Sequence, residues 1–500
     1  MEQRQCDGFF ELMEALGLAC SFNDVRLKTG YSEIKPADAS LETRFSRRVT
    51  LQMPIVSAAM DTVTEESMAI AMAKLGGLGI VHKALTPKEQ ADIVTKVKYD
   101  LNGLIARPVC VSVNDTVSDV LLMREKKRYK FFSFMVTDEH DKIVGVVTHN
   151  DFDFCGDKSK KIGDIMSCNI ISAASNITIA EAYEKMISNS KKILPIFDGN
   201  QFRGIYTLSD VKRILNGNSR TFNLDASGSL RVGAAIGVGS DLEERLELLS
   251  RARVDVVVID TAHGNSKGVV ETIRYCKERY PDIDVVAGNI SEGEAARRLV
   301  DAGADGIKVG QGPGSICTTR IVAGIGRPQL SAVYECEKAI RGSGVPICAD
   351  GGIETSGDIT IALAAGADSV MLGRLLAGTK ESPGDVIFND GRQVKVYRGM
   401  GSLEAMLQNQ ASRERYGQAD APVGKLVPEG VKGLIDFKGE VAPIIFQLTG
   451  GLRSGMGYVG AVDIAVLHDK ADFFRITSSG LVESHPHGLD KIENYKPLNS

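Results

Sequence analysis

The 500-residue chain contains no tryptophan and only seven histidines. The histidines show no HExxH or comparable spacing, which argues against a zinc enzyme. Its nine cysteines are never closer than twelve positions, so the CxxC motif is absent, and their odd number disfavours a disulfide framework. We therefore expect a reducing compartment, with the protein in the cytoplasm.

The chain also lacks an excess of basic charge and long apolar runs. It has 59 Lys and Arg against 64 Asp and Glu, a net charge of −5, which argues against a nucleic-acid partner. No stretch approaches the ~18 apolar residues of a membrane span, so we expect no membrane partner. The first residues, MEQRQCDGFFELMEALGL, lack the basic-then-apolar layout of a signal peptide. With 43% apolar residues, the chain can bury a sizeable core.

Glycine, by contrast, is abundant, with 52 residues that recur directly after short apolar runs. Such runs, rich in Val and Ile, are typical of strands buried on both faces. Eight of them are predicted as strands: Met53–Ala58, Gly79–His82, Leu230–Gly237, Val254–Asp260, Val285–Asn289, Gly306–Gly310, Val345–Asp350 and Ser369–Gly373. Helix-like stretches such as Asp241–Ala252 and Lys267–Tyr280 lie between them. The pattern predicts an α/β fold, a (β/α)8 TIM barrel, with active groups at the carboxyl ends of its strands.

Residues from about 93 to 220 interrupt this alternation and contain an internal repeat. PVCVSVNDTVSDVLLM (108–123) parallels NIISAASNITIAEAYEKM (169–186), and GVVTHND (145–151) parallels GIYTLSD (204–210). The spacing predicts two copies of a ~60-residue unit, at about 93–163 and 164–220. We therefore expect a paired module inserted into a barrel formed by residues 1–92 and 221–500.

The segment Lys308–Arg320, KVGQGPGSICTTR, follows a predicted strand and carries the strongest chemical signal. Its glycines, Gly310, Gly312 and Gly314, allow the backbone to approach a ligand closely. Cys317 in such a loop is accessible enough to attack an electrophilic carbon as a thiolate. The alternative is a glycine-rich connector with an ordinary cysteine.

Two further loops, Asp350-Gly351-Gly352 and Gly373-Arg374, follow the next strands and suit phosphate binding through backbone N–H groups. The alternative is a pair of tight turns. The polar, Gly- and Pro-rich stretch 397–437 indicates a lid over the barrel mouth, the flap, at about 399–437. The alternative there is a solvated loop.

Eight segments match one family's pattern in order: MPIVSAAMDTVTE (53–65), IDTAHG (259–264), GNI (288–290), GPGSICTTRIVAGIG (312–326), ADGGI (349–353), YRGMGS (397–402), RYGQ (415–418) and PEGVKG (428–433). Over nearly its whole length the chain resembles the inosine monophosphate (IMP) dehydrogenases and their sister guanosine monophosphate (GMP) reductases. The inserted repeat is similar to the tandem CBS (Bateman) pair of the dehydrogenases. Arg415-Tyr416 matches the dehydrogenase flap pair, which the reductases lack, so the dehydrogenase is favoured over a GMP reductase or a non-catalytic, nucleotide-sensing barrel.

The resemblance implies that Cys317 attacks C2 of IMP, that hydride passes to NAD, and that the covalent thioimidate is hydrolysed to xanthosine monophosphate. Arg415 and Tyr416 would activate the water, with Thr319 and Glu429 as a second route. An arginine is an unusual base because its guanidinium normally stays protonated.

The resemblance also implies a set of ligand contacts. The phosphate would be held by Ser315, Gly352, Gly373 and Tyr397, the ribose by Asp350, and the base would be surrounded by Met60, Met400, Gly401 and Glu429. Arg374 stands where many members have serine, and there it would either add charge to the phosphate site or point away from it. Asp260, Asn289, Gly310 and Gly312 would border NAD. A potassium ion would bind carbonyls of Gly312, Gly314 and Cys317, completed by Glu483, Ser484 and His485 of a neighbouring subunit in a homotetramer, which could pair into an octamer.

In CBS pairs the pattern G-h-h-T-x-x-D places Thr on phosphates and Asp on ribose. Here it occurs twice, as Thr148/Asp151 and Thr207/Asp210. We expect purine nucleotides to bind there and regulate activity or assembly. The alternative is a purely structural pair.

Overall fold

The computed structural model describes residues 4–100, 104–105, 108–127, 132–140, 142–199, 201–216 and 221–487. The chain divides into two compact units. The first comprises Met1–Lys98, Arg220–Asp225 and Leu230–Ser500, and the second comprises Tyr99–Ser219 with Ala226–Ser229.

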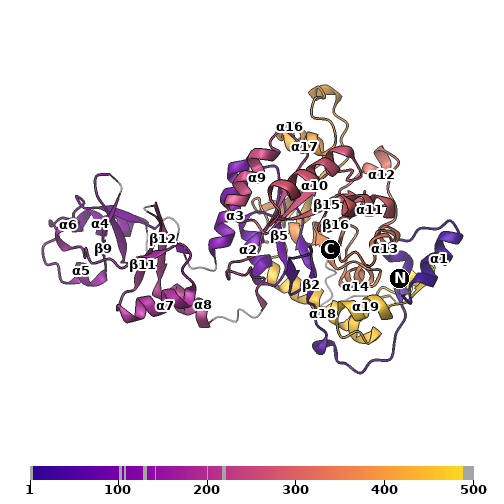
Figure 1. Ribbon diagram of the computed structural model, residues 1–500, viewed down its shortest axis with the longest axis horizontal. Helices are drawn as coiled ribbons and strands as arrows, with labels where there is room; N and C mark the ends of the chain where they lie inside the picture. The colour runs from indigo at the N-terminus through magenta and orange to yellow at the C-terminus, as the bar shows by residue number, and fades with distance from the viewer. Residues whose placement is uncertain are drawn as a thin grey trace. The chain divides into compact units, whose positions relative to one another are not determined.

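The first unit is built on a closed barrel of eight parallel strands (Figure 1). In barrel order they are β13 (Gly233–Ile236), β14 (Val256–Asp260), β15 (Asp284–Ile290), β16 (Gly306–Val309), β17 (Ile347–Asp350), β18 (Ser369–Leu372), β4 (Ile55–Ser57) and β5 (Leu78–Val81). Each overlaps one of the eight predicted strands, so the predicted TIM barrel is confirmed. Nearly every residue in these strands is buried, which explains why they are continuous apolar runs rather than alternating ones.

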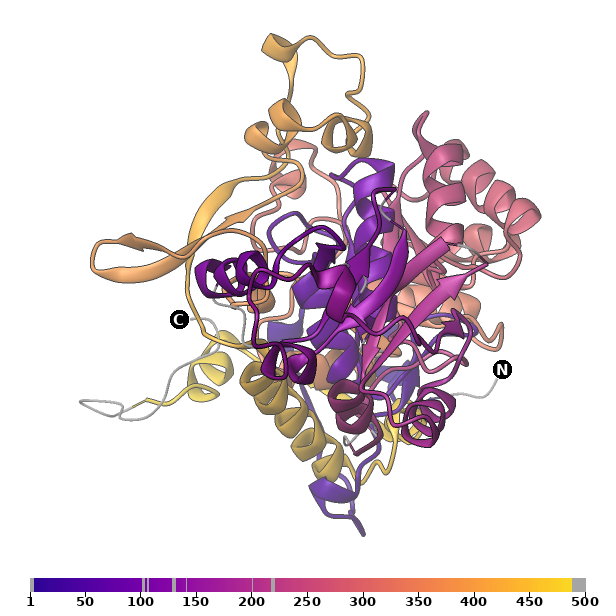
Figure 2. The same ribbon diagram turned by 90° about the vertical axis from the view of Figure 1, so that its left-hand side faces the viewer.

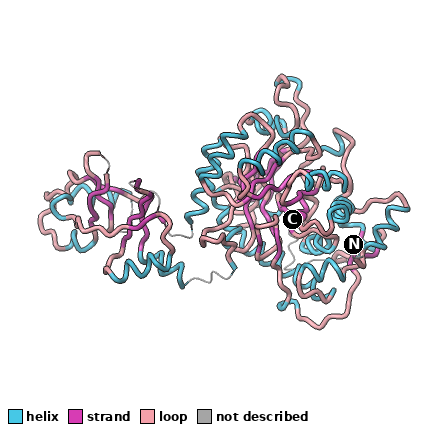
Figure 3. The backbone as a smooth tube through the Cα atoms, viewed as in Figure 1, coloured by secondary structure: helices cyan, strands magenta, loops and turns pink. Residues whose placement is uncertain are grey.

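Helices follow the strands and enclose them, as the cyan tubes around the magenta barrel show in Figure 3. They are α2 (Glu66–Lys74), α3 (Pro87–Asp100), α9 (Leu242–Arg251), α10 (Lys267–Arg279), α11 (Gly293–Asp301), α12 (Thr319–Val322), α13 (Gln329–Ile340), α14 (Ser356–Ala364) and α15 (Arg374–Ala377). The domain boundary that we placed after residue 92 lies within α3, which continues to Asp100. The chain leaves the barrel unit at the end of this helix.

Smaller elements complete the barrel unit. They are α1 (Asp7–Ala15), β1 (Val25–Leu27) paired with β22 (Phe473–Arg475), β2 (Thr43–Arg44) paired with β3 (Thr50–Leu51), α18 (Val441–Val459), α19 (Ile464–Lys470) and α20 (Ser478–Glu483), with short 3-10 turns at Phe22–Asp24 and Pro36–Asp38. Helix α18 packs against α14 on the outside of the barrel. Among the described residues, no helix combines the length and the apolar character needed to cross a membrane.

The predicted flap is more ordered than the open excursion that its composition suggests. Its base is a sheet of β19 (Ile387–Asn389), β20 (Arg392–Arg398) and β21 (Lys432–Asp436), seen as orange ribbons in Figure 2. Between β20 and β21 lie α16 (Leu403–Gln408), α17 (Gln410–Arg415) and a 3-10 turn at Val423–Lys425. The antiparallel pairing of Arg398 with Lys432 fixes where the flap leaves the barrel and where it returns.

The second unit contains two small sheets, each with its own core. One joins β10 (Ala173–Ala174), β11 (Ile193–Asp198), β12 (Gln201–Thr207) and β6 (Leu104–Ile105), with α7 (Ile179–Ser188) and α8 (Leu208–Asn216). The other joins β7 (Cys110–Ser112), β8 (Phe134–Thr137) and β9 (Ile143–Val147), with α4 (Val117–Lys127), α5 (His149–Asp153) and α6 (Ile162–Ile165). In chain order both halves run strand, helix, strand, strand, helix, as β7-α4-β8-β9-α5 and β10-α7-β11-β12-α8. As a CBS pair this unit stays a prediction.

Candidate functional site at the carboxyl ends of the barrel strands

A pocket lies where the loops after the barrel strands meet the flap. All the predicted catalytic, substrate and cofactor residues line it: Met60, Asp260, Asn289, Gly310, Gly312, Ser315, Cys317, Thr319, Asp350, Gly352, Gly373, Arg374, Tyr397, Met400, Gly401, Arg415, Tyr416 and Glu429, together with Gly314. They come from six barrel strands and the flap, so the fold gathers residues that are more than 350 positions apart in the sequence. This convergence is what the carboxyl face of a TIM barrel provides.

The cysteine loop begins directly at the end of β16 and folds tightly. Gly310 has φ +147°, and a side chain there would meet the main-chain oxygen of Asp350, so the loop runs against the end of β17. The Cys317 amide donates to the Gly314 carbonyl (3.0 Å). The Cys317 thiol donates to the Thr319 hydroxyl (3.2 Å).

Cys317 is half-buried and is the one cysteine among the pocket-lining residues. Elsewhere, burial raises the pKa of Cys6, Cys276 and Cys348 to about 12. Those thiols therefore stay protonated and unreactive at neutral pH. The more accessible Cys110, Cys155 and Cys168 lie in the second unit, so its place in the pocket makes Cys317 the nucleophile candidate.

A charged network crosses the floor of the pocket. The Lys308 amine lies 2.9 Å from the Asp260 carboxylate and 2.8 Å from the Asp350 carboxylate, and it donates to the Asn289 amide oxygen. The Asn289 amide in turn donates to Asp350 (2.9 Å) and to the Gly310 carbonyl (2.8 Å). Because Lys308 is 1% exposed, this amine fixes both carboxylates in position.

The flap reaches into the same pocket. The Arg415 guanidinium pairs with the Asp260 carboxylate, and the Arg415 carbonyl accepts from the Ala262 amide (3.2 Å). Burial raises the pKa of Tyr416, although neighbouring Arg415 opposes the shift. On the return of the flap, the Glu429 carbonyl accepts from the Thr318 amide (3.0 Å), which ties it to the cysteine loop.

Another part of the pocket, which we call its phosphate end, is lined by the loops after β17 and β18. Gly351 and Gly352 both have positive φ, +92° and +78°, so the turn after β17 requires glycine there. Burial raises the pKa of Tyr397 to about 12, which keeps its hydroxyl protonated as a donor. Arg374 lines this end too, with its guanidinium 3.5 Å from the Glu354 carboxylate.

A family profile described as the IMP dehydrogenase / GMP reductase domain matches residues 19–487. The chain belongs to this family.

Its relatives include both branches of the IMP dehydrogenase / GMP reductase family. The inosine-5'-monophosphate dehydrogenases of Aquifex aeolicus and Bacillus subtilis are 48% and 45% identical over 94% of this chain and 95% of each relative. A solved structure of a cysteine-to-alanine variant of the Trypanosoma brucei GMP reductase, in complex with guanosine 5'-monophosphate, has a TM-score of 0.81 and 39% identity over 95% of this chain and 99% of that one. The sequence resemblance to the family is therefore confirmed.

Two parts of the family resemblance lie outside the pocket. Glu483, Ser484 and His485 end or follow α20; the Ser484 hydroxyl donates to Gly480 (2.7 Å), and none of the three lines the pocket of its own chain. Thr148 and Thr207 lie in the second unit, where each hydroxyl donates to the aspartate three residues later, Asp151 (2.8 Å) and Asp210 (2.6 Å).

Sequence reasoning missed Lys308, although it opens the cysteine segment. The available signal was a lysine inside the otherwise apolar strand GIKV, where a buried charge needs a partner. It also missed Lys83 and Glu414, which connect the barrel to the flap.

Proposed function

We propose that this member of the family oxidises IMP to xanthosine monophosphate with NAD, a step in guanine nucleotide synthesis. The observation that carries the proposal is the presence of Arg415 and Tyr416 in the same pocket as Cys317. A GMP reductase needs the cysteine but has no water to activate, so the pair distinguishes the two. The 45–48% identity to IMP dehydrogenases supports the same choice.

Substrate binding follows from the two ends of the pocket. Asp350, fixed by Lys308, would accept hydrogen bonds from the ribose hydroxyls. The phosphate end would be formed by Ser315, Gly352, Gly373, Arg374 and Tyr397, and the base would lie among Met60, Met400, Gly401 and Glu429. Backbone N–H groups at glycine turns and an arginine are the donors that a phosphate prefers.

The proposed chemistry has two halves. The Cys317 thiolate forms a bond to C2 of IMP, and hydride leaves from C2; bound NAD supplies the acceptor for that hydride. The resulting thioimidate is then attacked by water at C2, and the C2–S bond breaks to give xanthosine monophosphate and free Cys317. Covalent catalysis splits a difficult oxidation into two easier steps.

Arg415 and Tyr416 would hold the attacking water, and Thr319 with Glu429 offers a second route for its proton. The Cys317–Thr319 hydrogen bond of 3.2 Å supports the second route, because it places that hydroxyl beside the reacting sulfur. A guanidinium normally stays protonated, so Arg415 would orient the attacking water better than it would remove a proton from it.

Asp260 has two proposed partners that exclude each other. It would bind the nicotinamide ribose of NAD, beside Asn289, Gly310 and Gly312, yet here it pairs with Arg415. The pocket residues fit the cofactor, since a carboxylate suits ribose hydroxyls. The shared carboxylate supports an order in which NAD departs before the flap closes.

The cysteine loop also fits a potassium ion. Gly314 and Cys317 are the two ends of one turn, in which the Cys317 amide donates to the Gly314 carbonyl, and Gly312 lies two residues before that turn. Oxygen ligands of this kind suit a large monovalent cation, which would brace the loop. We propose that Glu483–His485 of a neighbouring copy completes the site in a homotetramer.

For the second unit we propose a tandem CBS pair that binds purine nucleotides through Thr148, Asp151, Thr207 and Asp210. Isothermal titration of the full chain with ATP tests this. Submillimolar affinity that is lost in an Asp151→Ala, Asp210→Ala double variant supports the proposal, and no binding at millimolar ATP contradicts it. We also propose a cytoplasmic location, which the nine free cysteines support.

The main experiment mixes purified protein with IMP, NAD and potassium and follows NADH absorbance. NADH production that is lost in Cys317→Ala and kept in Cys168→Ala, a change at an exposed cysteine of the second unit, supports the proposal. Oxidation of NADPH with GMP, without NADH from IMP, would instead identify a reductase. Inactivity with both substrates would favour a non-catalytic barrel.

A further inference from the structure

The loop after β5, residues 82–86, is held rigid by a buried polar network. The Gln90 amide on α3 donates to the carbonyls of Val81 (3.0 Å), His82 (3.1 Å) and Ala235 (2.9 Å). Arg245 on α9 donates to the Gln90 side-chain oxygen (2.8 Å) and to the Leu85 carbonyl (3.0 Å). Gln90 and Arg245 are 0% and 2% exposed, so the carbonyl groups of the loop are held by buried side chains whose own hydrogen bonds are made.

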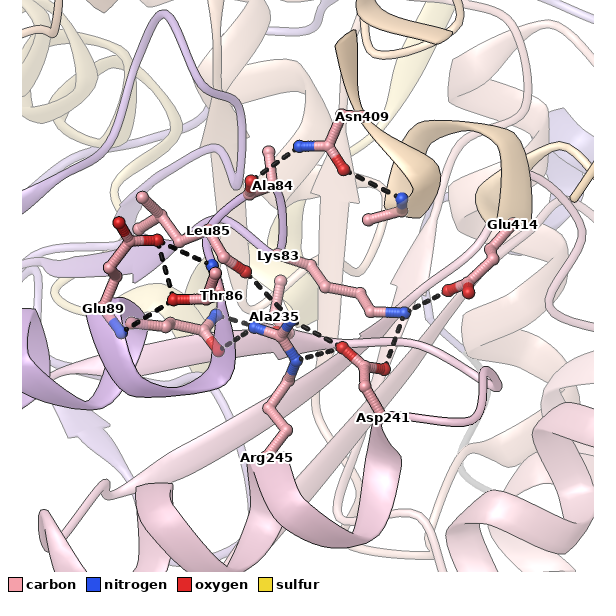
Figure 4. Close-up of polar contacts among 12 residues, drawn as sticks. Lys83, Ala84, Leu85, Thr86, Glu89, Ala235, Asp241, Arg245, Asn409 and Glu414 are labelled. Carbon is pink, nitrogen blue, oxygen red and sulfur yellow. Dashed lines mark hydrogen bonds and ion pairs between the residues drawn. The ribbon is translucent and has the colours of Figure 1, made fainter. Parts of the chain in front are cut away.

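This fixed loop contacts both ends of the flap helix α17 (Figure 4). At the start of the helix, the Asn409 amide donates to the Ala84 carbonyl (2.6 Å), while its oxygen caps the helix by accepting from the Ala411 amide (2.8 Å). At its end, the Lys83 amine lies 2.6 Å from the Glu414 carboxylate. The next residue is Arg415, which reaches Asp260.

The Lys83–Glu414 pair occupies a cradle with little spare room. The two side chains are 10% and 20% exposed. A side chain at Gly237 would lie 2.7 Å from the Lys83 amine, and one at Gly239 would overlap the Glu414 carboxylate. Two glycines of the loop after β13 therefore leave space for an ion pair that forms only when the flap is docked.

Asp241 holds the Lys83 side chain on the barrel side of this ion pair. Its carboxylate lies 3.2 Å from the Lys83 amine and accepts two hydrogen bonds from Arg245 (2.9 and 2.6 Å). Burial opposes its charge, but Arg245 and Lys83 together hold the pKa of Asp241 below its ordinary value. Asp241 thus stays ionised and keeps the Lys83 amine aimed at the flap.

We propose that Lys83 is a positioning residue that latches the closed flap through Glu414 and so holds Arg415 in the pocket for the hydrolysis half of the reaction. The inference rests on the proposed function, since it assigns Lys83 to one half-reaction. A contact present in only one of two states stabilises that state by its own free energy, so losing it opens the flap. Hydride transfer, in which Cys317 acts without Arg415, is unaffected.

The test separates the two half-reactions. In Lys83→Met, steady-state kcat with IMP and NAD falls on the order of tenfold, while the rate and amplitude of the pre-steady-state NADH burst stay unchanged. Glu414→Gln shows the same split, and the double variant is no worse than the worse single variant, because both remove one interaction. Lys96→Met, which breaks an exposed ion pair with Glu66 on the outside of the barrel, leaves both quantities unchanged.

A second measurement needs no catalysis. Trypsin cleavage of the ligand-free protein within the flap, at Arg413 or Lys425, becomes on the order of tenfold faster in Lys83→Met and not in Lys96→Met. Equal cleavage rates, an unchanged kcat, or a burst slowed as much as kcat would overturn the latch. If the unsubstituted protein makes no NADH, the proposed function fails, and the trypsin comparison still decides whether Lys83 holds the flap.

Discussion

Replacing Lys308 by methionine should damage the pocket more than any other single change on the barrel floor. Methionine has a similar volume but no charge, so the substitution leaves the carboxylates of Asp260 and Asp350 without the buried amine between them. The Asn289 amide oxygen loses its donor as well. Two like charges then share a desolvated site, which is unfavourable for folding and for substrate binding alike.

The magnitude follows from the contacts that remain. Removing one partner from a buried ion pair costs about 3–5 kcal/mol. Asp260 keeps Arg415, and Asp350 keeps the Asn289 amide at 2.9 Å, so we expect the lower value, about 3 kcal/mol. In a unit of this size that corresponds to an apparent Tm lower by about 4 °C. Since Asp350 loses its support, affinity for IMP should fall by more than about tenfold.

Thermal unfolding followed by circular dichroism and calorimetric titration with IMP measure the two effects. Lys395→Met is the matched control because Lys395 is also 1% exposed, but its amine donates to the carbonyls of Thr379 and Ser382 at the base of the flap. That variant should lose stability and keep its IMP affinity. A Lys308→Met protein with unchanged Tm and unchanged IMP binding would refute the role assigned to the network.

Three further outcomes are expected. Cys317→Ala should lower NADH production at least about 10³-fold and abolish the covalent purine adduct detected by mass spectrometry, while calorimetry still detects IMP binding. Arg415→Ala should keep the NADH burst but lower steady-state turnover about 10²-fold or more, and loss of the burst would contradict its placement in hydrolysis. Burial lowers the pKa of His468 to about 4, so the unfolded chain takes up a proton near pH 6.5 and the folded chain only near pH 4. Stability should therefore fall by up to about 3 kcal/mol as pH drops through that window, and His468→Gln should show a flatter profile of Tm against pH.

The barrel could be predicted from sequence because its strands are buried on both faces. They therefore appear as continuous apolar runs, and glycines mark where the runs end. The flap helices could not be predicted. Helices α16 and α17 are six residues each, too short to be stable without tertiary contacts. Helix α17 depends on the contacts of Asn409 and Glu414 with the loop after β5. These residues are more than 300 positions from that loop in the sequence, so no local pattern indicates the contacts.

The site divides in the same way. Cys317 and its glycines stand in one contiguous segment and were predicted together, whereas Lys308 was passed over because its partners come from β14 and β17. The Thr-x-x-Asp patterns in the second unit are ambiguous for another reason. The same capping arrangement begins helices at Thr86–Glu89, Thr116–Asp119 and Thr355–Asp358, so the spacing alone cannot separate nucleotide binding from helix capping.

The order of strands in the barrel has a consequence for synthesis of the protein. Strand β4 pairs with β18, in a register that joins Ile55 to Val370. Strand β5 pairs with β13, although the sequence of the second unit separates the two strands along the chain. A growing chain therefore presents β4 with one open edge until residue 372 has left the ribosome. Open parallel edges invite aggregation, and such distant pairings form slowly. Nearly all of the second compact unit is made before the remaining barrel strands, so this unit has the time to fold first. The yield of active barrel should then depend on chaperones that shield β4 and β5 in that interval.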